Sequence, residues 1–151
     1  MRNAKRNVNL WMIIIAVVTA ALLAVLSWGN LRFARENPGG KDFLVHWVGT
    51  RALITEGLNP YSDEVATRIQ TMAYGRPAQP GEHELRVAYP LYSIVVFAPF
   101  ALVPDFNIAR AAWMTVLEVG LVLMTLLSLR LSRWRVGPII IVLLLLFSLF
   151  W

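Results

Sequence analysis

A carboxylate and an imidazole stand four residues apart in a segment that the sequence predicts to be helical. Asp42 and His46 fall on one face of a helix over 42–56, because side chains four positions apart are stacked one turn above the other. A carboxylate there can accept a proton from a hydroxyl within hydrogen-bond reach. It can equally cap the helix, since Asp following Gly39-Gly40 is a common N-cap. His46 can orient Asp42, bind an acceptor, or be a polar residue on a solvated face.

Other polar and aromatic side chains flank this pair. Arg51 falls on the opposite helix face from Asp42 and can contact lipid headgroups, an acid of the same loop, or a donor phosphate. Tyr61, Tyr89 and Tyr92 can form a rim that stacks on a sugar. Aromatic residues are also expected at any membrane interface, so both roles stay open for the tyrosines.

Two further acidic positions are informative. The run Glu82-His83-Glu84 lacks the helical spacing that places ligands on one face, so no metal site is predicted there or elsewhere, although a divalent metal is not excluded. Glu118 lies inside a long apolar stretch. Because a charge at the centre of a bilayer costs roughly 2.5–3.5 kcal/mol, we expect Glu118 to be an intramembrane polar residue that contacts another helix, faces a cavity or stays protonated.

The elements that must position these residues belong to a membrane protein. Hydrophobic residues make up 58% of the 151 residues and charged residues only 15%, against roughly 25% in a soluble domain. Mean hydropathy is +0.59. The absence of cysteine excludes disulfides, thiolate nucleophiles and Cys-ligated metals. This composition predicts an all-α integral membrane protein.

The excess of positive charge is confined to two short patches beside apolar runs. These patches hold Arg2, Lys5 and Arg6, and Arg130, Arg133 and Arg135, whereas residues 29–106 carry nearly balanced charges. This distribution follows the positive-inside rule and argues against nucleic-acid binding. It predicts a cytoplasmic N-terminus over 1–9 and a cytoplasmic basic loop over 130–137.

The apolar runs predict three transmembrane helices. The uncharged run 10–28 spans about 28 Å as a helix, close to the ~30 Å hydrocarbon core. A second span is predicted over 107–129, and a third begins in 138–151. Because the chain ends within an apolar run, we expect it to be the N-terminal part of a longer multi-pass protein, or a truncated descendant of one.

Residues 29–106 are predicted to form an external loop with interfacial helices over about 42–56, 62–73 and 89–103. Ser62 is the expected N-cap of the second helix. The segment 89–103 is apolar but contains Pro90 and Pro99, and it either crosses the membrane or lies at its surface. The charge distribution favours the surface, because a crossing would place the second basic patch outside.

Short motifs in this loop are similar to those of a known enzyme family. Residues 41–61 read KDFLVHWVGTRALITEGLNPY, and residues 89–104 read YPLYSIVVFAPFALVP. They resemble the start of glycosyltransferase family 87, membrane enzymes of the GT-C fold related to polyprenol-phosphate-mannose-dependent mannosyltransferases. In that family an Asp-Phe pair leads into G-R-A-L-L-x-G-x-x-P-Y, followed by Y-P-P-L and A-P-L-A-L-L-P. Thr50 and Leu91 depart from this pattern.

The resemblance implies a function and a set of site residues. Asp42 matches the acid that acts as general base on the acceptor hydroxyl, and His46, Arg51, Tyr61 and Tyr89 become candidates for substrate binding. The implied activity is transfer of a sugar, mannose by resemblance, from a polyprenyl-phosphate donor on the external face of a bacterial cytoplasmic membrane, without a cofactor. If 151 residues are the natural length we expect no activity. The alternative is a non-catalytic membrane subunit of a larger complex, with other membrane subunits as partners.

Overall fold

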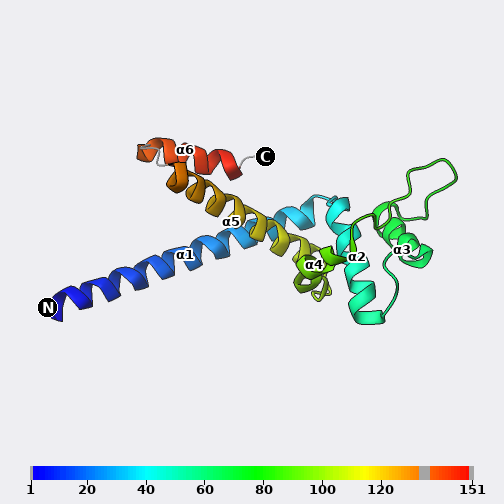
Figure 1. Cartoon of the computed structure of the whole chain (residues 1–151), viewed down its shortest axis with the longest axis horizontal. Helices are drawn as coiled ribbons and strands as arrows, with labels where there is room; N and C mark the ends of the chain where they lie inside the picture. The colour runs from blue at the N-terminus through cyan, green and yellow to red at the C-terminus, as the bar shows by residue number, and fades with distance from the viewer. Residues whose placement is uncertain (1, 133–136, 150–151) are drawn as a thin grey trace. The chain divides into compact units, whose positions relative to one another are not determined.

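A computed structural model describes residues 2–132 and 137–149, and every regular element in these residues is helical. The helices are α1 (Arg2–Glu36), α2 (Lys41–Glu56), α3 (Asp63–Tyr74), the short 3₁₀ turn η1 (Leu91–Ser93), α4 (Ile94–Ala101), α5 (Phe106–Ser132) and α6 (Pro138–Leu149) (Figure 1). The predicted all-α class is thus confirmed for the described part of the chain. Arg133 and Arg135, from the predicted basic loop, lie outside it.

The chain divides into two compact units. The apolar unit comprises residues 1–30 and 113–151, and the polar unit is Leu31–Ala112. The helices α1 and α5 each contribute to both units, whereas α2, α3 and α4 belong entirely to the polar unit.

Two of the described helices are long and apolar enough to cross a membrane, over Leu10–Glu36 and Phe106–Ser132. The structure extends the first helix beyond the predicted 10–28 to Glu36, and in this added part Arg32 pairs with Glu36 one turn later. The helix ends only before Pro38 and Gly39. Of the predicted third span, the structure describes a helix of 12 residues, α6.

The helices of the polar unit begin and end close to their predicted positions. Ser62 caps α3 as expected, accepting a hydrogen bond from the Val65 backbone N–H at 3.4 Å. The expected alternative role of Asp42 as an N-cap is wrong. Gly40 takes that position in a left-handed conformation, φ +73°, without a side-chain cap, and Asp42 lies in the first turn of α2.

The segment 89–103 folds as a short 3₁₀ turn followed by α4. The helix α4 has 8 residues, and Pro99 inside it removes one backbone donor. α4 is therefore much shorter than the 20 or so residues that a transmembrane helix needs.

An aromatic cluster forms the core of the polar unit around α2, with α3 and α4 packed against that helix (Figure 1). The ring of Phe43 lies 6.2 Å from Phe97, 6.3 Å from Phe100 and 5.9 Å from Phe106. On the α3 side, Val65 and Ile69 are fully buried. Burial of these side chains holds the three helices together, since each large apolar side chain removed from water stabilises by roughly 1.5–3 kcal/mol.

The polar loop after α3 is held by side chains of the helices beside it. The buried Gln70 amide accepts a hydrogen bond from the Ala78 N–H at 2.8 Å and donates to the Leu85 carbonyl at 3.5 Å. Further along, Val87 packs so closely on Gly49 that a Cβ at position 49 would lie 2.6 Å from its methyl carbon. Gly49 therefore allows the loop to approach the α2 backbone.

Candidate functional site

Asp42 is an exposed carboxylate at the N-terminal end of α2. No hydrogen bond or ion pair holds its side chain within residues 2–132 and 137–149, unlike Asp63, which pairs with Arg86 at 2.7 Å. Asp42 is thus a carboxylate without a protein partner in these residues and with open access to solvent.

One turn further along α2, His46 is held between aromatic rings. Its imidazole stacks on Phe97 at 3.8 Å and 13°, and lies 4.0 Å from the ring of Tyr89. Burial lowers the pKa of His46 from its ordinary value of 6.5, while the negative charge of Asp42 opposes that shift. His46 is therefore neutral at pH 7. The negative charge of Asp42 would stabilise only the protonated form of this imidazole.

Tyr61 and Tyr89 join His46, but they close the space beside it. The Tyr61 hydroxyl donates to the Tyr89 carbonyl at 2.7 Å, and this pins the two segments together. The cavity that these residues line has a volume of only about 10 Å³. That is room for about one water molecule. The tyrosines therefore pack beside His46 and leave no room there for a ligand larger than a water molecule.

Arg51 lies away from this cluster, as its helix position predicts. Its guanidinium donates to the Ala101 carbonyl at 2.9 Å and lies 5.6 Å from the Trp47 ring. Trp47 in turn donates from its indole N–H to the Val103 carbonyl at 3.2 Å. Since carbonyls at a helix C-terminus lack intrahelical partners, both side chains stabilise the end of α4.

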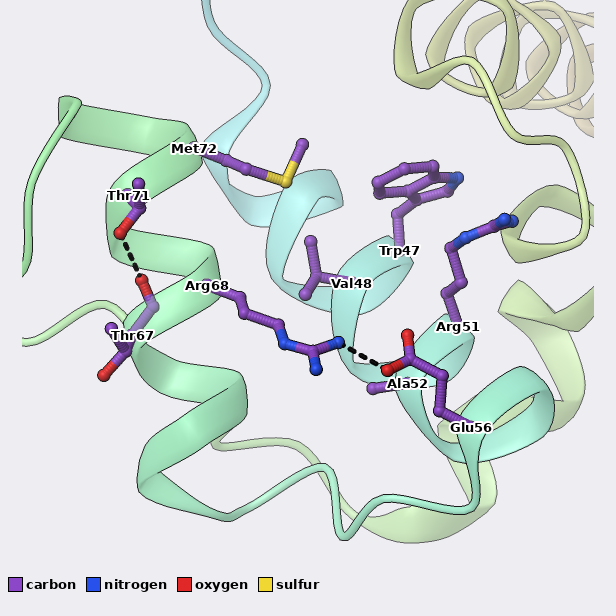
Figure 2. Close-up of a pocket in the computed structure, with 9 residues that line it drawn as sticks. All are labelled: Trp47, Val48, Arg51, Ala52, Glu56, Thr67, Arg68, Thr71 and Met72. Atoms are coloured by element: carbon purple, nitrogen blue, oxygen red, sulfur yellow. Dashed lines mark hydrogen bonds and ion pairs between the residues drawn. The ribbon is translucent and has the colours of Figure 1, made fainter.

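Arg51 and Trp47 also line the wall of a cavity of about 430 Å³ between α2 and α3, large enough for a small ligand (Figure 2). Figure 2 shows Arg68 on the α3 side reaching across to Glu56, with which it pairs at 2.7 Å. Arg68 also pairs with Glu64 at 2.7 Å. The charge of Arg68 is therefore balanced, and Arg51 is the cation of this cavity without a carboxylate partner in the described chain.

The acidic run in the loop is engaged in ion pairs. Glu82 accepts two hydrogen bonds from Arg76, each 2.7 Å long. The Arg76 guanidinium and the Gln79 backbone N–H hold the pKa of Glu82 at about 2. No group of three or more potential metal ligands occurs among the residues that the structure describes.

Within the apolar unit, Glu118 contacts the other long helix. The Asn30 amide donates to the Glu118 carboxylate at 2.6 Å and to the Thr115 hydroxyl at 3.0 Å. Asn30 is buried. Of the roles predicted for Glu118, the structure shows the polar contact between helices.

The structure brings His46, Tyr61 and Tyr89 together around one small cavity, and Asp42 lies one turn before His46 on α2. Arg51 lines a different cavity, and Glu118 lies in the apolar unit. Sequence reasoning missed Trp47 and Arg110, both of which donate to backbone carbonyls. The signal for Arg110 was present, since it is an arginine near the start of a predicted transmembrane helix.

Comparison with known proteins adds no assignment: no family model, no curated protein and no solved structure matches this chain.

Proposed function

We propose that this chain is the N-terminal part of an integral-membrane glycosyltransferase in which Asp42 is the general base. The observation that carries the proposal is the unpaired carboxylate of Asp42, exposed in the first turn of α2 and one helical turn before His46, which packs on Tyr89. The motifs that resemble glycosyltransferase family 87 support the same role for this residue.

The proposed reaction needs little from the protein beyond a positioned carboxylate. Asp42 accepts the proton of an acceptor hydroxyl as its oxygen attacks the anomeric carbon of a polyprenyl-phosphate sugar. The bond from that carbon to the phosphate oxygen breaks, polyprenyl phosphate leaves, and the configuration inverts. The neutral imidazole of His46 leaves the Asp42 carboxylate without a competing cation, so that Asp42 remains available as a base.

The proposed placement is a bacterial cytoplasmic membrane, with the N-terminus in the cytoplasm and the polar unit outside. The two apolar helices and the basic patches support this arrangement. A face of exposed apolar side chains on η1 and α4 supports a position of α4 at the bilayer surface: Leu91, Tyr92, Val95, Val96 and Leu102. Since the chain has no cysteine, single cysteines at Gly81 and Arg6 test the topology. An impermeant thiol reagent should label position 81 in intact cells and leave position 6 unlabelled.

The test of the catalytic role is substitution at the native locus of the gene, with turnover of polyprenyl-phosphate mannose measured in isolated membranes. Asp42→Asn should lower the rate by about 10²–10⁴-fold, the usual loss when a general base is removed. Because Gly40 and not Asp42 occupies the N-cap, the folded yield should stay close to normal.

The matched control is Asp63→Asn, since Asp63 is also an exposed acid in the first turn of a helix. This variant should keep near-normal turnover. Normal turnover of Asp42→Asn together with a large loss for Asp63→Asn would move the base to Asp63. Normal turnover of both variants would remove Asp42 from the proposal.

A second candidate function is that of a non-catalytic membrane subunit. The closed cavity of about 10 Å³ beside His46 favours it, as does the use of Arg51 to hold a backbone carbonyl. Under this alternative Asp42→Asn leaves the membranes fully active. Substitution of the exposed Val95 on α4 by Asp instead releases the chain from a larger complex, seen as a smaller particle in detergent.

A further inference from the structure

A buried arginine at the base of α5 has no acidic partner. The side chain of Arg110 is 9% exposed, and no carboxylate of the described residues lies within ion-pair distance of its guanidinium. Its contacts are a hydrogen bond of 2.8 Å to the Asn37 carbonyl and the ring of Phe33 at 5.7 Å. Buried charges are normally paired, because desolvation of an isolated ion is costly.

The bond to Asn37 explains only part of this arrangement. Asn37 directly follows α1, so Arg110 satisfies a carbonyl at the C-terminal end of that helix. A guanidinium has five N–H donors, however, and this carbonyl takes one of them. No buried nitrogen in the described chain is left without a partner, so the other donors of Arg110 are open to a cavity rather than sealed.

That cavity has a volume of about 340 Å³ and its described lining contains no acidic residue. Lys41 and Arg110 supply positive charge, and Asn107 supplies an amide. Gly39 and Gly40 make room for the guanidinium, since a Cβ at Gly40 would lie 2.8 Å from the Arg110 Nε. The N-terminal end of α2, which has no side-chain cap, begins at Lys41 and adds a partial positive charge.

We infer that this cavity binds a phosphate group, with the planar Arg110 guanidinium as its main donor and Lys41 as a second cation. Arginine matches the geometry of a phosphate, and charge-assisted hydrogen bonds to it are about twice as strong as neutral ones. Arg110 lies one turn into a helix that is long and apolar enough to span a membrane, and anionic headgroups attract basic residues beside such helices. The phosphate of an anionic lipid and free phosphate share this chemistry.

This site is distinct from that of the proposed base. Lys41 and Leu44 line the cavity, whereas Asp42 and His46 lie about 150° around α2 at 100° per residue. The inference therefore stands or fails independently of the glycosyltransferase proposal, because its test measures binding and not transfer.

The experiment is calorimetric titration of the full chain in a non-ionic, phosphate-free detergent at constant ionic strength. The titrants are dioctanoyl phosphatidylglycerol, sodium phosphate and, as a control without a phosphate, dioctanoyl glycerol. Saturable binding of the phospholipid alone identifies a headgroup site, and binding of both phosphates identifies a site for the free anion. If neither phosphate binds, or if dioctanoyl glycerol binds as tightly as the phospholipid, the inference is wrong.

Three variants locate the site. Lys41→Gln should weaken binding by about tenfold while leaving the Arg110–Asn37 bond in place. Arg110→Lys keeps one charge and one donor for the Asn37 carbonyl but loses the planar fork, and should weaken binding at least as much. Arg35→Gln removes an equal charge from an exposed position in the last turn of α1 and should bind within about twofold of the original chain.

If Arg110→Lys fails to fold, Lys41→Gln tests the site by itself, because Lys41 is exposed and its ammonium makes only a contact with the exposed Tyr74 ring at 4.4 Å. A far-ultraviolet circular dichroism spectrum establishes the fold of each variant. Unchanged affinity in a folded Lys41→Gln chain, or an equal loss in Arg35→Gln, would overturn the assignment.

Discussion

The apolar and polar units differ in which side chains they bury and which they expose. In the polar unit Val65 and Ile69 are fully buried, and charged residues form ion pairs at the surface. In the apolar unit large apolar side chains are exposed along the helix, as with Trp11 at 64% and Val25 at 67%. Its polar side chains instead turn toward one another, as Asn30 and Glu118 do.

This difference is what we expect of a chain that lies partly in water and partly in lipid. In water, burial of apolar surface is favourable, so a water-exposed unit needs a hydrophobic core. In lipid, burial of apolar side chains gains little free energy, whereas polar groups must form hydrogen bonds within the protein. The boundary between the two units falls inside α1 and inside α5.

The largest expected effect is loss of core volume in the polar unit. Ile69→Ala should destabilise the fold by about 2–5 kcal/mol, because Ile69 is fully buried between α3 and α2 and leaves a cavity. Met72→Ala, one turn along but 53% exposed, is the matched control and should cost far less. Urea unfolding monitored by circular dichroism gives both values. Equal losses in the two variants would show that α3 has no core side distinct from its surface.

A tight approach between the loop and α2 should give the next largest effect. Gly49→Ala places a Cβ 2.6 Å from a methyl carbon of Val87, and overpacking of this kind costs about 1–3 kcal/mol. Val87→Ala combined with Gly49→Ala should recover part of that loss, since it removes the opposing methyl group. The same unfolding measurement tests the pair. Additive losses in the double variant would mean that the two residues do not touch.

The elements of the polar unit could largely be predicted from the sequence, because they depend on local signals. Ser62 as a cap and Gly57 at the end of α2 mark helix boundaries through backbone chemistry that neighbouring residues determine. The same reasoning misplaced the cap of α2. Gly39 and Gly40 adopt positive φ angles there and leave space for the Arg110 side chain. Arg110 is far away in the sequence, so local signals do not show this.

For the candidate site, the sequence could predict which residues take part but not how they contact one another. Helical periodicity correctly separates Arg51 from Asp42, because the two lie on different faces of one helix. Periodicity cannot show that Tyr61 donates to the Tyr89 carbonyl and so closes the space beside His46, since this bond joins segments 28 residues apart. Partners distant in the sequence decide whether a polar residue is free to react or is held in the structure.

In the apolar unit we expect replacement of a polar residue by an apolar one to reduce stability. Asn30→Leu, which would be harmless on a water-exposed helix, should destabilise the contact of α1 with α5 by about 0.5–2 kcal/mol by leaving Glu118 without its donor. Glu118→Gln in the same background should restore part of the loss, because the uncharged amide is less costly in lipid. Steric-trap or unfolding measurements in bicelles give the values. No coupling between the two positions would make their hydrogen bond irrelevant to stability.

The smallest expected effect is a pH dependence at His46, which tests whether the polar unit buries this imidazole in its neutral form. Burial lowers the pKa of His46 in the folded chain below its ordinary value of 6.5, so the unfolded chain binds more protons on acidification. The melting temperature should therefore be highest above about pH 6.5 and fall as the pH drops below it. His46→Gln should reduce the slope in this range. Asp42→Asn should steepen it, because the Asp42 charge raises the pKa of His46 and that support is lost. An identical slope in the original chain and in His46→Gln would mean that the stacked imidazole does not resist protonation.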